Sequence, residues 1–198
     1  DSANAAGEKS AALSKDSYAK DDHAVALGAG TLTRAATSEN TATVGSLTYS
    51  GFAGNTPTAV VSVGSGETVT YTPPDHTTPG RTVTINPHQR QIVNVGAGNI
   101  SATSTDAING SQLYAVAGVG DNVANSVKNI VGGNTVLNSD GSITTTDIGG
   151  TGKNTIDEAI RSINPVLNVK DPVAPTDAAN KRYVDNKVHS LDRKSRAG

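Results

Sequence analysis

The stretch TSTDAINGSQLYAV, residues 103–116, decides the fold, because it begins as polar, turn-rich chain and ends with helical spacing. A second phrase, TDAANKRYV, repeats it at residues 176–184. The aligned residues are Thr105 with Thr176, Asp106 with Asp177, Ala107 with Ala178, Asn109 with Asn180 and Leu113 with Val184. Since Thr and Asp side chains cap helices well, the simplest interpretation is a helix N-cap used twice, with Thr and Asp at the helix mouth. A cap alone does not explain why the Asn recurs as well.

Apolar residues after the first phrase follow a heptad seam, at Leu113, Val116, Val123, Val127 and Ile130, with Gly120 at the missing position. A second register shares Leu113, Gly120 and Val127 and is filled by Ala117 and Ala124; we prefer the first, whose side chains are larger. β-Branched residues at both core positions favour three strands over two. Such a short helix is marginal alone, so we expect it to bury its seam against other copies of the chain.

The composition excludes several classes of protein. The 198 residues include one Phe, five Tyr and no Trp, Cys or Met, with 17 % charged residues and a net charge of −2. The low net charge argues against disorder, and the absence of Cys excludes a disulfide framework. The absence of Met predicts a fragment or a processed product. No apolar run is as long as a membrane helix, and the charge balance gives no reason to expect nucleic acid. An elongated, repetitive fold remains, in which each unit buries little surface.

Short repeats near the N-terminus predict the coils of a β-solenoid. SAALS, residues 10–14, and AVALG, residues 24–28, lie fourteen residues apart, and TATVG, residues 41–45, follows at a spacing of seventeen. Each copy alternates small and aliphatic residues before a turn, as short strands do. We therefore expect three coils.

The segments that follow alternate between strand and helix patterns. Strands are expected at residues 59–64, 67–72, 81–86 and 90–95, with the proline-rich PPDHTTPG as an exposed loop. After the seam, residues 134–146 predict a hairpin and residues 153–163 a helix capped by Thr155. A proline-rich extended link then leads to a last seam at Val184, Val188 and Leu191. This alternation is awkward for a monomer and natural for a parallel homotrimeric fibre.

Residues Asp106 to Leu113 match a D-A-[VI]-N-x-x-Q-L phrase, and in this the chain resembles the neck of the YadA-like trimeric autotransporter adhesins. SAALSKDSYAK and DHAVALGAGTLTRA resemble the β-roll repeat of the family's head, and LTYSGFAGNTPTAVVSVG resembles its Trp-ring module. The chain departs from that module, because it has no Trp and because residues 66–86 resemble an insertion. What replaces the ring, and any ligand inferred from a standard head, therefore stay open.

The resemblance implies a mixed β and coiled-coil fold: an elongated parallel homotrimer with a left-handed β-roll or β-prism-like head, a neck, and a trimeric coiled-coil stalk with a small β insert. The implied boundaries are residues 1–46 for the β-roll repeats, 47–98 for the Trp-ring-like module, 99–131 for the neck and first coiled coil, 132–164 for an FGG- or DALL-like insert, 165–175 for an extended linker, and 176–198 for a second neck-like motif and coiled coil leading to a membrane anchor.

The same resemblance implies a non-enzymatic adhesin on the outer membrane of a Gram-negative bacterium, secreted by the type V route. Expected partners are two further copies of the chain and, on the outside, collagen, laminin, fibronectin or an abiotic surface. The alternative is a segment of a trimeric phage tail fibre, against which the neck phrase argues.

The candidate sites are structural rather than catalytic. The expected neck and trimer-interface residues are Asp106, Ile108, Asn109, Leu113, Val116, Val123, Val127, Ile130, Asp177, Asn180, Val184, Val188 and Leu191. Asn109 either holds a chloride ion on the trimer axis, which is the one expected cofactor, or bonds backbone and fixes register. Pro73, Pro74, Asp75 and His76 are the expected ligand-contact loop. Asp21–His23 and Asn138–Gly141 are interpreted as turns rather than cation sites, and no nucleophile is paired with a base.

Overall fold

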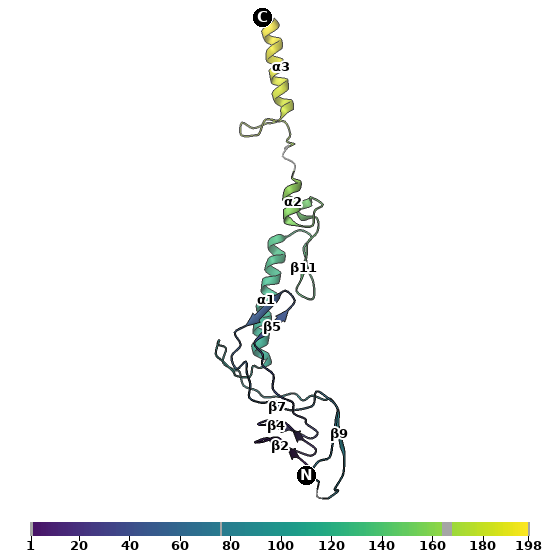
Figure 1. Cartoon of the computed structure of the whole chain (residues 1–198). Coiled ribbons are helices and arrows are strands. Elements are labelled where there is room, and N and C mark those ends of the chain that lie inside the picture. Colours follow the sequence, from purple (N-terminus) through teal and green to yellow (C-terminus); the bar gives the residue numbers. More distant parts are fainter. Residues whose placement is uncertain (1, 76, 164–167, 198) are drawn as a thin grey trace. The chain divides into compact units, whose positions relative to one another are not determined.

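The computed structural model describes residues 2–75, 77–163 and 168–197 (Figure 1). The chain divides into two compact units between Ala115 and Val116. The strands of the first unit are β1 Asn4–Ala5, β2 Ala11–Leu13, β3 Tyr18–Ala19, β4 Val25–Leu27, β5 Thr41–Val44, β6 Leu47–Ser50, β7 Val61–Ser62, β8 Val69–Tyr71 and β9 Val83–Ile85. Helix α1, Gly110–Val131, begins in the first unit and continues into the second. The second unit also contains β10 Val136–Leu137, β11 Ile143–Thr144, the 3₁₀ turn η1 Ile148–Gly150, α2 Ile156–Ser162 and α3 Lys181–Ala197.

Parallel strand pairs with a constant offset build the N-terminal part of the first unit. β1 pairs with β3, so that Asn4 lies beside Tyr18, and β2 pairs with β4, so that Leu13 lies beside Leu27. Both offsets are fourteen residues, the spacing between SAALS and AVALG. The predicted repeat is confirmed for these two coils.

The turns of the coils repeat one backbone conformation at the same spacing. Ser2, Asp16 and Gly30 have φ angles of 62°, 61° and 63°, and Lys9 and His23 have 54° and 62°. Positive φ is uncommon outside glycine. Because Ser, Asp, Lys and His adopt it here, the stacking of coils sets the turn conformation.

The core of the coils consists of small side chains. The buried residues are Ser17, Ala19, Ala24, Ala26, Thr31, Leu32 and Thr33. The buried hydroxyls are hydrogen-bonded, as interior polar groups must be: Ser17 Oγ donates to the Ser14 carbonyl at 2.7 Å and Thr31 Oγ1 donates to the Leu27 carbonyl at 3.0 Å. Narrow coils of this kind can be filled without large aromatic side chains.

The prediction that TATVG forms a third coil is wrong. Thr41–Val44 is β5, which pairs antiparallel with β6, and the strand that continues the parallel ladder beside β4 is β7, with Val61 opposite Val25. The expected boundary after residue 46 therefore falls within the turn of a hairpin. Alternation of apolar and polar residues cannot distinguish parallel from antiparallel pairing, whereas the Gly45–Ser46 pair between the strands suits a two-residue hairpin turn.

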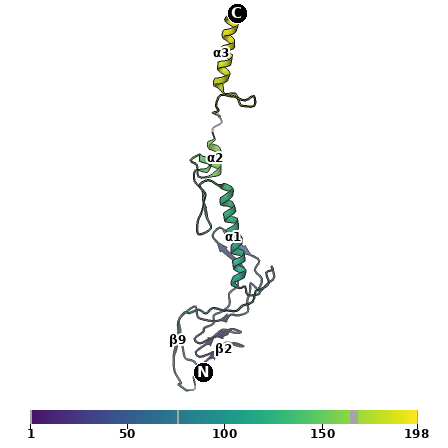
Figure 2. The ribbon, with the colours of Figure 1, turned by 180° about the vertical axis from the view of Figure 1, so that it is seen from behind.

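Strands β8 and β9 form an antiparallel ribbon that runs alongside the coils (Figure 2). Thr70 and Thr84 share a hydrogen bond of 2.9 Å on its outer face. On the other face Ile85 is buried, and the ring of Tyr71 stacks on that of Tyr18 with 4.2 Å between centroids. The residues expected to be an insertion therefore cover the coils.

The prediction of a strand at residues 90–95 is wrong, because the structure assigns none there. Side-chain bonds tie this segment to the coils instead. The Arg90 guanidinium donates to the carbonyls of Ala29 and Val63, both at 2.8 Å, and to Thr31 Oγ1 at 2.9 Å.

The elements predicted for the second unit are present. β10 and β11 form the expected hairpin, in which Val136 lies opposite Thr144. Helix α2 is capped by Thr155, whose Oγ1 accepts the Glu158 backbone N–H at 3.1 Å. The expected linker is non-helical over residues 168–175, and residues 164–167 lie outside the described chain.

Candidate functional site

Each recurring phrase ends in an asparagine that caps a helix. Helices α1 and α3 begin one residue after Asn109 and Asn180. Asn109 Oδ1 accepts the Gln112 backbone N–H at 3.4 Å, and Asn180 Oδ1 accepts that of Tyr183 at 2.7 Å. The prediction that the Thr or Asp of each phrase caps the helix is wrong, because each helix begins three or four residues later than such a cap requires.

The same asparagines fasten the chain that leads into each helix. Asn109 Nδ2 donates to the Val95 carbonyl at 3.1 Å, and Asn180 Nδ2 donates to the Val169 carbonyl at 2.9 Å. A carboxylate accepts hydrogen bonds but donates none, so Asp could cap the helix but not hold the upstream carbonyl. This double role explains why Asn recurs. We call residues 95–112 the first handover segment and residues 169–183 the second.

The aspartates of the phrases hold the loops before the helices. Asp106 Oδ2 accepts the Asn99 N–H at 2.9 Å. Asp177 Oδ2 accepts the N–H groups of Ala174 and Val173, both at 2.9 Å, and these bonds hold the pKa of Asp177 below its ordinary value. Both side chains therefore shape the handover loops.

The first handover segment contains a second fastening between Gln112 and Gly98. Gln112 Nε2 donates to the Gly98 carbonyl at 2.7 Å, and Gln112 Oε1 accepts the Gly98 N–H at 2.9 Å. A Cβ atom on Gly98 would lie 2.2 Å from the Ala107 carbonyl oxygen, which no real contact allows. Glycine is required here by the close approach of two backbone segments.

In the second handover segment an ion pair takes the place of this amide fastening. Tyr183 stands where the first segment has Gln112. Asp171 Oδ1 accepts hydrogen bonds from Asn180 Nδ2 at 2.8 Å and from Arg182 Nη2 at 2.9 Å. Asn180 and then Arg182 hold the pKa of Asp171 below its ordinary value. The two segments therefore share the asparagine and the aspartate and differ in the remaining contacts.

Sequence reasoning did not single out most of the contact partners in the handover segments. These are Val95, Gly98, Val169, Asp171 and Arg182; Gln112 belongs to the neck phrase but had no assigned role. A longer alignment would have found two of them, because Val93-Asn94-Val95 lies before the first phrase much as Leu167-Asn168-Val169 lies before the second.

The predicted seam residues are exposed in the single chain. Within α1 the exposed fractions are 68 % for Leu113 and 83 % for Ile130, and α1 and α3 have no buried residue. The other exposed apolar residues predicted at the interface are Ile108, Val116, Val123, Val127, Val184, Val188 and Leu191. Helices this apolar on one side need a partner surface.

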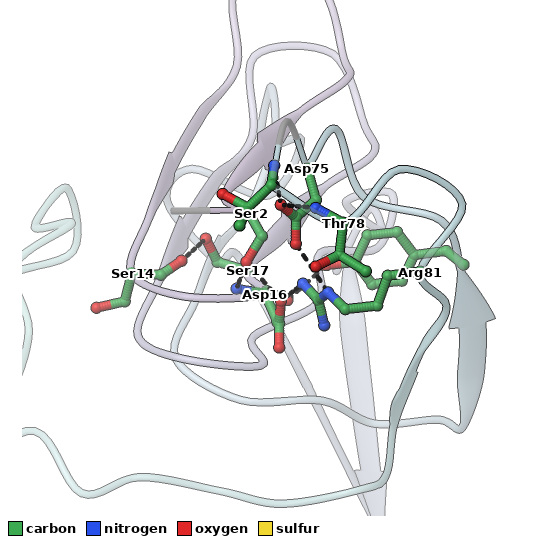
Figure 3. Close-up of polar contacts among 9 residues, drawn as sticks. Ser2, Ser14, Asp16, Ser17, Asp75, Thr78 and Arg81 are labelled. Carbon is green, nitrogen blue, oxygen red and sulfur yellow. Dashed lines mark hydrogen bonds and ion pairs between the residues drawn. The ribbon is translucent and has the colours of Figure 1, made fainter.

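The expected ligand-contact loop is tied to the coils by a double ion pair (Figure 3). Arg81 Nε lies 2.9 Å from Asp75 Oδ2, and Arg81 Nη2 lies 2.7 Å from Asp16 Oδ1. Pro73 is buried and Pro74 is exposed, while His76 lies outside the described residues. At least Asp75 is therefore engaged within the chain. We call Asp16, Asp75 and Arg81 the clasp.

The clasp and its neighbour Tyr71 have shifted pKa values. The hydrogen bond from Arg81, followed by the N–H groups of Thr78 and Thr77, lowers the pKa of Asp75. Burial alone would raise the pKa of Asp16, but bonds from Arg81 and Ser2 outweigh it and lower the pKa. Burial, with the charge of Asp16, raises the pKa of Tyr71 to about 12. Its hydroxyl donates to the Asp16 carbonyl at 2.6 Å.

A shallow hollow of about 510 Å³ lies between the ribbon and the coils, lined by residues that include Lys15, Gly30, Asn86 and His88. Over the described part of the chain, no three His, Asp or Glu side chains gather as a metal site would require. Within those same residues no helix is long and apolar enough to span a membrane. The hairpin turn at Asn138–Gly141 is closed by Asp140 accepting the Ser142 N–H at 2.9 Å, as expected for a turn.

These contacts hold one backbone segment against another, and the apolar seams of α1 and α3 are exposed. That combination defines a class of structural protein in which β-coils are followed by helical segments. A family model for the coiled stalk of trimeric autotransporter adhesins matches residues 91–136, which include the first handover segment and α1.

Known adhesins are similar to other parts as well. The trimeric autotransporter adhesin AtaA of Acinetobacter sp. (strain Tol 5) is 62 % identical over 73 residues, which is 36 % of this chain and 2 % of that protein. The autotransporter adhesin BtaE of Brucella suis biovar 1 (strain 1330) is 33 % identical over 113 residues, 57 % of this chain and 13 % of that protein. The chain thus spans a small part of the relatives it matches.

A solved structure gives a similar result. The C-terminal YadA-like domain of BPSL2063 from Burkholderia pseudomallei aligns with 69 % of this chain and 57 % of its own, with a TM-score of 0.50 and 33 % identity. Over these stretches the chain is similar to the YadA-like trimeric autotransporter adhesins.

Proposed function

We propose that this chain is a segment of a homotrimeric adhesin in which three copies share the seams of α1 and α3. The observation that carries the proposal is the exposure of those seams, since a helix with an uncovered apolar stripe is marginal in water. Three copies around one axis bury the stripes in a coiled coil. The similarity to the trimeric autotransporter adhesin AtaA supports this arrangement.

Within such a trimer the handover segments would act as necks that join β-structure to coiled coil. Asp106 and Asn109 in the first segment, and Asp177 and Asn180 in the second, lock the loop that precedes each helix. Ile108, which is 49 % exposed, would pack against a neighbouring copy. The β-coils and ribbons form the head, and β10, β11 and α2 form the insert between stalk segments.

The chloride expected at Asn109 stays a proposal beside its alternative. Asn109 Nδ2 donates one hydrogen bond to the Val95 carbonyl, which favours the interpretation that this amide fixes register. An amide has two N–H donors, so the second could still face an axial anion.

The proposed role is adhesion without catalysis, at the surface of a Gram-negative cell and held to the outer membrane by a C-terminal anchor. Collagen, laminin, fibronectin and abiotic surfaces are the proposed targets. Trimeric repetition gives avidity, so that weak single contacts suffice. The phage tail fibre alternative is not favoured, because the relatives are adhesins.

Leu113→Asp tests the proposed assembly. Three carboxylates in one core layer cannot be buried together, so we expect the variant to be monomeric by light scattering where the unchanged chain is trimeric. Tyr114→Asp is the matched control, because Tyr114 is 81 % exposed and lies beside the seam in the same helix; it should remain trimeric. A stable monomer of the unchanged chain would contradict the proposal.

A further inference from the structure

The charged residues beside the seam of α3 are sorted by sign, with acidic residues on one flank and basic residues on the other. With Val184 and Leu191 at heptad position d and Val188 and Ser195 at position a, the residues at position e are Asp185 and Asp192. The residues at position g are Lys187 and Lys194. One flank of the seam is therefore acidic and the other basic. Charged residues at positions e and g determine which helices pair in coiled coils and in which orientation.

The corresponding flanks of α1 are uncharged. In the register of Leu113 at a and Val116 at d, position e holds Ala117 and Ala124, and position g holds Val119 and Ser126. Its two charged residues, Asp121 and Lys128, both fall at position b, away from the seam. Charge can therefore select a partner for α3 and not for α1.

The side chains on these flanks are free enough to meet a partner. Asp192 is 54 % exposed and lies 3.5 Å from Arg196, a long contact on its own helix. Lys187 Nζ lies 5.4 Å from the centroid of the Tyr183 ring, a cation–π contact at the helix surface. Neither contact buries the charge, and both can coexist with an ion pair to another chain.

We propose that α3 docks on a second copy of itself, parallel and in register, through an ion pair between Lys187 of one copy and Asp192 of the next. In a parallel coiled coil, position g of one helix faces position e of the following heptad in its neighbour, five residues further along. Five residues after Lys187 is Asp192. This rests on the proposed trimer and deepens it, because it assigns the parallel orientation of the C-terminal stalk to two named residues.

The opposite orientation is disfavoured by the same charges. In an antiparallel pair, g faces g and e faces e, which would place lysine against lysine and aspartate against aspartate. The charges thus act against the antiparallel pairing as well as for the parallel one.

Cysteine cross-linking tests this directly, because the chain has no Cys of its own. Ser195→Cys places one thiol at position a of α3, where copies can form a disulfide only when they are parallel and in register, since the Cα atoms must lie within about 7 Å. Four variants of the full chain are made in this Ser195→Cys background: Lys187→Glu, Asp192→Lys, the double variant of these two, and Arg193→Glu. Each is oxidised, and its cross-linked fraction is compared with that of the Ser195→Cys parent. Arg193 lies at position f, opposite the seam, and its variant makes the same charge reversal as Lys187→Glu.

We expect each single variant at residues 187 and 192 to lower the cross-linked fraction at least about twofold at low salt, where surface charges are least screened. The double variant should restore it, and Arg193→Glu should leave it unchanged. The inference is overturned if Lys187→Glu cross-links as well as Arg193→Glu, or if the double variant is no better than the singles. Light scattering on the reduced parent separates the two proposals: a trimer with no charge effect overturns this inference alone, whereas a monomer overturns the proposed function and this inference with it.

Discussion

At the scale of single residues, the handover segments depend on groups that both donate and accept. Asn109 and Asn180 cap a helix with the oxygen of the amide and hold an upstream carbonyl with the nitrogen. Gln112 accepts the N–H of Gly98 with the oxygen of its amide and donates to the carbonyl of Gly98 with the nitrogen. Each amide therefore couples the start of a helix to an extended segment more than ten residues earlier, which a purely local cap cannot do.

Gly98→Ala should disrupt the first handover segment. The added methyl group would meet the Ala107 carbonyl oxygen at 2.2 Å, so one of two backbone segments must move and the Gln112 bonds must lengthen. Overpacking of this kind costs about 1–3 kcal/mol. We expect a lower thermal midpoint for the loss of α1 helicity, followed by circular dichroism.

Gly96→Ala is the control for this change, because a Cβ at Gly96 would meet no atom within 4 Å. It should leave the midpoint unchanged or raise it slightly, since alanine restricts the unfolded chain. Equal midpoints for the two variants would show that the close approach at Gly98 has no energetic weight.

At the scale of elements, two ribbons of similar pattern have different surroundings. In β5–β6, Thr43 and Thr48 share a hydrogen bond on one face, while Val44, Leu47 and Tyr49 are exposed. In β8–β9 a Thr pair also lies on one face, but the apolar face lies toward the coils and Ile85 is buried. Isolated two-stranded ribbons are only marginally stable. Packing against the coils therefore stabilises the β8–β9 ribbon, whereas the β5–β6 ribbon has no such contact on its apolar face within the described part of the chain.

The clasp should make the β8–β9 ribbon sensitive to pH. The pKa values of Asp16 and Asp75 are lowered in the folded chain, so their stabilisation is present above the unfolded pKa of 3.8 and is lost as the pH falls through the folded values. The pKa of Tyr71 is raised to about 12, so its stabilisation of the fold is present below about pH 10 and is lost as the pH rises from about 10 to about 12. Hydrogen-exchange protection of β8 and β9 should therefore fall at both extremes.

Asp75→Asn should lower that protection already at neutral pH, because the amide cannot form the ion pair with Arg81. Asp157→Asn is its control, because it removes a similar ion pair, that of Asp157 with Arg161 at 2.9 Å, from α2 in the second unit. Ribbon protection that is the same in both variants and unchanged by acid would show that the clasp does not hold the ribbon.

At the scale of the whole molecule, adhesion and assembly would use different parts of the chain. The seams of α1 and α3 are apolar stripes suited to identical partners, whereas the coils and ribbons present short loops and a mixture of polar and apolar side chains. A trimer multiplies any weak head contact threefold, which raises apparent affinity without a deep pocket.

A binding panel should separate these roles. Trimers of the full chain and of a truncation that lacks residues 1–98 are compared on immobilised collagen, laminin and fibronectin and on bare plastic. If the head binds, only the full chain should be retained, with a half-saturation concentration that rises at least about tenfold when Leu113→Asp removes avidity. Equal retention of the truncation would assign adhesion to the stalk, and no retention of either would assign this segment a spacing role.

The sequence by itself determined the periodic features. Fourteen-residue spacing predicted the β2–β4 pair, heptad spacing predicted α1 and α3, and Thr155 predicted the start of α2, because each depends on local geometry that repeats along the chain. The neck phrase pointed to the family, and it located both handover segments to within a few residues.

Only the tertiary structure decided which distant groups meet. The local sequence does not show that the strand at Val61, rather than the one at Thr41, pairs with β4, since apolar and polar residues alternate in both segments. Asn109 forms a hydrogen bond with Val95, and Arg81 forms an ion pair with Asp16. The chain between the partners could adopt many other loop conformations, so the sequence alone does not predict these contacts. Spacing fixes what a segment can form, and packing selects the partner, because loop closure costs little more for a distant partner than for a near one.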